Sequence, residues 1–118
     1  MLGTPGIARA QQLAARVLGD IGRQRKAETA FAVSVRDRAQ LNRLTGRGLC
    51  HGTGGLVATG RRIAADALTS IPLTPLLNLH RQAPAAPDEP PGFLDGTAGA
   101  TLTAVGVATC WDACLLLC

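Results

Sequence analysis

A tetrapeptide of the form Gly-Thr-x-Gly occurs three times in this chain, and this repeat constrains the fold more than any other feature. The copies stand at residues 3–6, 52–55 and 96–99, so successive copies begin 49 and 44 residues apart. Each copy leads into small and apolar residues with helical periodicity, at 7–18, 56–68 and 100–108. Three helices that begin in the same way predict three equivalent places in a repeated architecture.

The tetrapeptide has the chemistry of a helix start. A threonine hydroxyl can accept an N–H of the first turn, and we expect Thr4, Thr53 and Thr97 to be N-cap residues. Pro5 would occupy the first helical position, where its missing N–H costs nothing. The glycine before each threonine would allow a sharp approach of the chain, and the glycine after it would let another backbone come close.

Further helices are predicted between these repeats. Residues 28–44 carry an amphipathic face that includes Phe31, Val35 and Leu44, and glycines at 46 and 48 end the pattern. Residues 72–79 predict a shorter helix with four leucines, and the proline-rich segment 82–91 predicts an extended loop. The sequence therefore predicts an all-α fold, an α/α helical-repeat array with its small-residue helices inside.

Composition restricts the class of protein. The chain has 118 residues, of which 47% are apolar and 17% charged, which fits one folded domain rather than a disordered segment. No apolar run reaches the roughly 20 residues that span a bilayer. The first residues show no signal-peptide pattern, so we expect a cytoplasmic location.

Charge is unevenly distributed along the chain. Residues 1–81 hold all 12 Lys and Arg and four acids, whereas residues 82–118 hold four acids and no Lys or Arg. The arginines form no dense run and have no interleaved aromatic residues, so we expect solvated helical surfaces and no nucleic-acid partner.

Three of the four cysteines lie near the end of the sequence. Cys110, Cys114 and Cys118 are spaced by four residues, which would place them on one face of a helix. Two thiolates so placed could share a metal ion, but free cysteine is commonly buried among apolar residues. We favour packing in a core for these three.

The fourth cysteine stands beside a histidine, directly before the second repeat. Cys50 and His51 supply a sulfur and a nitrogen, the ligand types that zinc prefers, and would form half of a zinc site. Alternatively, Cys50 is a small buried residue and His51 bonds a backbone carbonyl. The other histidine, His80, is expected on the surface.

Several segments together resemble the lanthionine synthetase C-like family, the lanthipeptide cyclases. The segment 49–56, Leu-Cys-His-Gly-Thr-Gly-Gly-Leu, resembles the Cys-His-Gly motif of that family. Residues 93–100 resemble its later Asp-Gly-x-Ala-Gly segment, residues 111–117 its tail, and residues 3–8 the part that follows a Trp-Cys-Tyr. The match covers essentially the whole chain, in order.

The resemblance implies an α/α toroid in which two cysteines and one histidine hold a zinc ion. The zinc activates a Cys thiolate of a precursor peptide, which adds to dehydroalanine or dehydrobutyrine and forms a thioether ring. Carried over to this chain, Cys50 and His51 match two of the zinc ligands. A dehydratase would be a further partner.

Two features of the family have no counterpart in this sequence. Met1 stands where the other zinc cysteine is expected, and the acid–base His and Asp and an Arg near the zinc lie upstream in the family. Residues 1–118 therefore resemble the C-terminal part of the domain, a partial toroid of about two and a half repeats. Its bare helix faces predict self-association and marginal stability. Two functions follow: a fragment of a zinc-dependent cyclase, or a non-enzymatic helical scaffold that binds peptide without metal.

Overall fold

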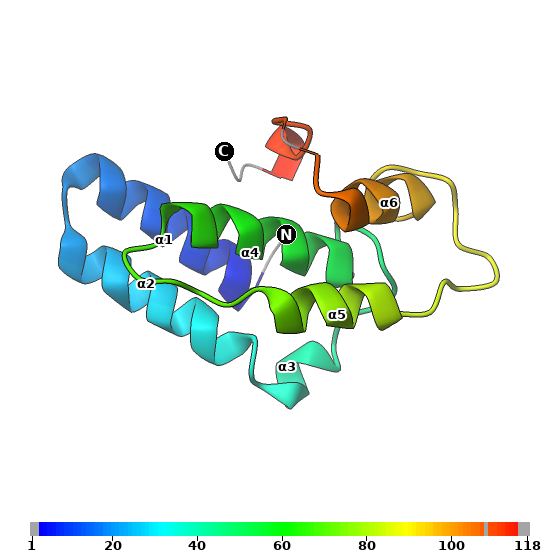
Figure 1. The fold of residues 1–118 in the computed structure, drawn as a ribbon, viewed down its shortest axis with the longest axis horizontal. Coiled ribbons are helices and arrows are strands. Elements are labelled where there is room, and N and C mark those ends of the chain that lie inside the picture. Colours follow the sequence, from blue (N-terminus) through cyan, green and yellow to red (C-terminus); the bar gives the residue numbers. More distant parts are fainter. Residues whose placement is uncertain (1–2, 108, 116–118) are drawn as a thin grey trace.

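The computed structural model describes residues 3–107 and 109–115, which fold into helices and connecting loops (Figure 1). The elements are α1 (Thr4–Leu18), α2 (Ile21–Ser34), α3 (Arg38–Leu41), α4 (Thr53–Asp66), α5 (Thr74–Gln82), α6 (Thr97–Val105) and a short 3-10 helix, η1 (Ala113–Leu115). The described residues contain no strand, so the prediction of an all-α fold is confirmed. The toroid and its repeats stay a prediction.

The three tetrapeptides lead into α1, α4 and α6, as predicted. Each helix begins at the threonine, but its N-cap is the preceding residue, Gly3, Gly52 or Gly96, and no threonine side chain caps the first turn. The prediction of threonine N-caps is therefore wrong by one position.

The amphipathic region predicted at 28–44 is divided between two helices. α2 starts earlier, at Ile21, because the side chain of Asp20 accepts the Arg23 N–H at 2.9 Å. A turn after Ser34 ends it, and Asp37 caps the short α3 by accepting the Ala39 N–H at 2.9 Å. The helix predicted at 72–79 is α5, displaced to Thr74–Gln82, and the chain from 83 to 96 runs as a loop.

α4 is the central helix of the fold (Figure 1). It contacts α1, α5 and α6, and the first eight residues from Thr53 to Gly60 are all buried. The main apolar cluster combines Leu56, Val57 and Ile63 of α4 with residues of the surrounding helices, namely Ala8, Phe31 and Leu76. In a second, smaller apolar cluster, Phe93, Trp111 and Leu115 pack against Leu49 and Ala58.

A buried polar network also joins α1, α2 and α4. The Arg9 guanidinium lies 2.7 Å from a carboxylate oxygen of Asp66, and the amide of Gln12 donates to Glu28 at 2.9 Å. Arg9, Gln12 and Glu28 are at most 5% exposed. The expected solvated surface is therefore wrong for Arg9, whose charge is buried and paired.

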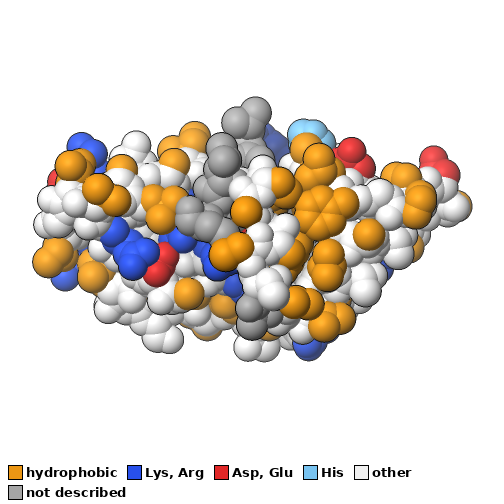
Figure 2. All heavy atoms as spheres, turned by 90° about the horizontal axis from the view of Figure 1, so that it is seen from above, with side chains coloured by type: hydrophobic (Ala, Val, Ile, Leu, Met, Phe, Trp, Pro, Cys, Tyr) orange, Lys and Arg blue, Asp and Glu red, His pale blue; other side chains and the backbone are white. Residues whose placement is uncertain are grey.

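The last described residues return to α4. Arg62 holds Asp112 through two hydrogen bonds of 3.0 and 2.5 Å, and the ring of Trp111 packs edge-on against Phe93. In Figure 2, apolar side chains gather on the right-hand half of the face shown, and acidic side chains lie along its upper right edge. Among the described helices, none is long and apolar enough to cross a bilayer.

Candidate metal site at the Cys50–His51 loop

The loop from Thr45 to Gly52 folds back over the first turn of α4. The N–H groups of Thr53, Gly54 and Gly55 donate to the carbonyl oxygens of Gly46, Arg47 and Gly48, each at 3.2 Å. The helix start is therefore capped by loop backbone, which is why the threonine hydroxyl is not needed as a cap.

Glycine is required where this loop and the helix meet. A Cβ atom on Gly52 would lie 2.6 Å from the nitrogen of Gly48 and 2.7 Å from the carbonyl oxygen of Gly46. Close backbone contact is therefore made at the glycine before the threonine as well, whereas we expected it at the glycine after the threonine.

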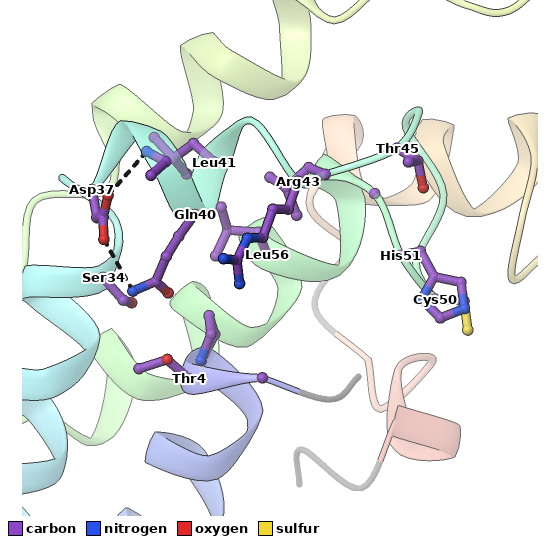
Figure 3. Close-up of a pocket in the computed structure, with 15 residues that line it drawn as sticks. Thr4, Ser34, Asp37, Gln40, Leu41, Arg43, Thr45, Cys50, His51 and Leu56 are labelled. Carbon is purple, nitrogen blue, oxygen red and sulfur yellow. Dashed lines mark hydrogen bonds between the residues drawn. The ribbon is translucent and has the colours of Figure 1, made fainter.

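Cys50 and His51 lie on this loop and line one cavity of about 620 Å³. Cys50 is a half-buried free thiol and His51 is exposed. The cavity is also lined by Gly3 and by the first residues of α1, Thr4 and Pro5, as well as by α3 and by Leu56. Figure 3 shows Cys50 and His51 at one end of this group and Asp37, Ser34 and Gln40 at the other.

The two predicted ligands are therefore brought to the same cavity. Their sulfur and nitrogen donors fit zinc, which takes such ligands in tetrahedral sites. In residues 3–107 and 109–115, no group of three or more His, Cys, Asp and Glu side chains is placed to hold a metal ion. Within the described residues, Cys50 and His51 alone would give a zinc ion only two of the three protein ligands typical of an open zinc site.

The outer side of the loop is anchored to the segment between α5 and α6. Arg47 donates to both carboxylate oxygens of Glu89, at 3.0 and 2.5 Å, and Thr97 donates to the same carboxylate at 3.0 Å. The Arg47 hydrogen bond is the main cause that lowers the pKa of Glu89 below its ordinary value. The N–H groups of Leu49 and Cys50 both donate to the carbonyl oxygen of Leu94, at 2.6 and 3.0 Å.

The start of α4, directly after the loop, is anchored by His80, which was expected on the surface. This expectation is wrong, because His80 is 4% exposed and both ring nitrogens have partners. Nδ1 lies 2.8 Å from the Thr53 hydroxyl, and Nε2 lies 2.9 Å from the carbonyl oxygen of Ala100. The sequence held a signal that we missed: Leu73, Leu76, Leu77 and His80 follow the helical spacing of one face.

The two described cysteines near the end of the sequence, Cys110 and Cys114, do not pack in a core. Cys110 and Cys114 are both exposed, and they lie on turns and η1 rather than on a regular helix. The core expectation is therefore wrong for these two, and Cys118 lies outside the described residues. Buried Asp112, paired with Arg62, was not singled out from the sequence.

Comparison with known proteins adds no family to this geometry. No protein-family model matches the chain, and no curated protein or solved structure matches it either.

Proposed function

We propose that Cys50 and His51 are two ligands of a zinc site in a lanthionine cyclase, of which this chain is a part. The observation that carries the proposal is that both side chains line the cavity at the start of α1. The resemblance places the third ligand at position 1, directly upstream of that helix.

The reach of the chain supports this assignment. Gly3 lines the cavity, and position 1 is two residues away, a distance of at most about 7 Å in an extended chain. A cysteine at that position would therefore be within reach of the cavity that holds Cys50 and His51.

The proposed role of this chain is to bind the zinc ion and to orient the Cys50 ligand toward it. When bound, zinc would stabilise the thiolate of a peptide cysteine near neutral pH, the nucleophile for addition to a dehydroamino acid. Cys50 and His51 would hold the metal from one side of the cavity. The loop hydrogen bonds to α4 and to Leu94 would fix the direction from which the Cys50 sulfur approaches.

The first test is metal binding by the isolated chain. Cobalt(II), a spectroscopic substitute for zinc, should give thiolate charge-transfer absorption that is lost in Cys50→Ser and weakened in His51→Asn. Cys110→Ser is the matched control, because Cys110 is an exposed thiol outside the cavity. Metal binding unchanged in Cys50→Ser would overturn the proposal.

The second test restores the absent ligand. We expect Met1→Cys, made behind an N-terminal tag, to raise zinc affinity by at least about tenfold, because each added thiolate ligand contributes to binding. The same substitution in a Cys50→Ser chain should give no such gain. Equal affinity of the Met1→Cys chain and the unmodified chain would contradict the assignment of position 1.

The size of the cavity favours a second candidate, a metal-free helical scaffold that binds a precursor peptide. At about 620 Å³ the cavity lies within the range of ordinary ligand sites. A scaffold would bind a cysteine-containing peptide equally well with zinc and with a chelator present. The cyclase fragment would bind it more tightly with zinc.

A further inference from the structure

Residues 80–100 hold the loop that carries Cys50 and His51 at two points and hold Thr53, the first residue of α4 after the loop, at a third. Glu89 holds Arg47 from outside, the Leu94 carbonyl holds the N–H groups of Leu49 and Cys50, and His80 holds Thr53. The first two contacts lie before His51 in the chain, and the third lies two residues after it. The candidate ligands are thus fixed on both sides by one segment of the chain.

The hydrogen bonds of His80 define which nitrogen carries its proton. A carbonyl oxygen only accepts, so Nε2 must donate to Ala100. In the neutral ring Nδ1 is then an acceptor, and the Thr53 hydroxyl donates to it. The side chain therefore links the start of α4, its own helix α5 and the first turns of α6 through two directional bonds.

This link is buried and has no alternative partner in solvent. His80 is 4% exposed and Thr53 6% exposed. Removing one member leaves the other as a buried polar group with an unmade hydrogen bond, which is costly. The lost hydrogen bond would destabilise the start of α4 at Thr53. Because the Thr53 N–H also donates to the carbonyl oxygen of Gly46, the loss would loosen the loop as well.

We propose that His80 is a positioning residue, which fixes the loop of Cys50 and His51 against α6 through Thr53. It does not line the cavity of Cys50 and His51 and acts through another residue. The inference takes from the proposed function only the role of Cys50 as a ligand, and the placement of the Cys50 thiol can be measured without metal.

The first readout is the reactivity of the Cys50 thiol. In a chain with Cys110→Ser, Cys114→Ser and Cys118→Ser, iodoacetamide would report on Cys50 alone. We expect His80→Asn and Thr53→Val to increase the alkylation rate of Cys50 by at least about threefold. Each variant removes the hydrogen bond between Thr53 and His80, and the adjacent loop should then open more often.

Two controls separate positioning from general stability. Thr53→Ser keeps the hydroxyl and should retain the rate of the unmodified chain. Ile63→Val removes a buried methyl group from the distant half of α4 and should lower the unfolding midpoint without raising the alkylation rate. An equal increase in Ile63→Val would show that His80 acts through stability alone and would overturn the inference.

The second readout uses cobalt(II). If the chain binds the metal through Cys50, Thr53→Val should weaken the thiolate absorption and Thr53→Ser should not. If the chain binds no metal, the zinc proposal fails while the alkylation result still decides the role of His80. Where His80→Asn does not fold, Thr53→Val carries the test, and an unchanged alkylation rate in Thr53→Val would overturn the inference.

Discussion

The Thr97 amide donates a hydrogen bond of 2.9 Å to the carbonyl oxygen of Pro90. The loop after α5 therefore closes on the first turn of α6, and Gly96 lies at the point of contact. A Cβ atom on Gly96 would lie 1.8 Å from that same carbonyl oxygen, which is far inside van der Waals contact. This closure presents Leu94 to the Cys50 loop.

The contact predicts that Gly96→Ala is destabilising. Because the clash is with backbone, the loop must move, and we expect a loss of about 1–3 kcal/mol in the free energy of unfolding. Gly92→Ala is the matched control, since a Cβ there meets no atom within 4 Å. Urea denaturation of the two variants gives the comparison. Equal midpoints for both would show that the closure is not rigid.

The ion pair of Arg47 and Glu89 predicts a dependence of stability on pH. Since the folded protein lowers the pKa of Glu89, the pair stabilises the fold above the ordinary pKa of a glutamate. That contribution is lost as the pH falls through the lowered value. Glu89→Gln should therefore have a lower urea midpoint than the unmodified chain near neutral pH, and the difference should shrink below about pH 4.

The neighbouring acid provides the control for this prediction. Asp88 is exposed, and Asp88→Asn should leave the midpoint nearly unchanged across the same pH range. A difference between Glu89→Gln and the unmodified chain that persists in acid would mean that charge is not its cause.

The buried carboxylate of Glu28 predicts a larger effect. Its Oε1 accepts from Gln12 and Gln24, at 2.9 and 2.8 Å, and its Oε2 accepts from the Leu68 N–H at 3.0 Å. Glu28→Ala removes the acceptor for all three donors, and we expect a loss of about 2–4 kcal/mol. Arg25→Ala, on the exposed face of the same helix, should change stability by less than about 0.5 kcal/mol. Thermal unfolding of both variants measures the difference.

The existence of the helices could be predicted from the sequence, because the small residues and the Gly-Thr-x-Gly pattern that indicate them lie within a few positions of one another. The residues that cap these helices could not be predicted in this way. Thr53 looks like an N-cap in sequence, but loop carbonyls from residues 46–48 take the first N–H groups of α4. Its hydroxyl is thereby left to bond His80, a partner 27 residues away.

The candidate site could likewise be predicted from the sequence only where local patterns decide it. The adjacency of Cys50 and His51 predicted two ligands on one loop, and the structure places both at one cavity. Burial of His80 and Arg9 depends on helices that are distant in sequence, so a surface assignment based on residue type alone failed for both. The leucine spacing before His80 was the one local sign of its burial.

Exposed apolar side chains at the turn between α1 and α2 predict self-association. Val17, Leu18 and Ile21 are 87%, 70% and 59% exposed, and they are close together in the chain. Burying one such side chain is worth roughly 1.5 kcal/mol, so each change to serine should weaken association by about tenfold. Val33→Ser is the control, because Val33 is 63% exposed near the other end of α2. Sedimentation equilibrium should show an association that Leu18→Ser weakens and Val33→Ser does not.

Because association stabilises the folded chain, the melting temperature of the unmodified protein should also rise with protein concentration. A monomer whose melting temperature stays constant over that range of concentration would contradict the prediction.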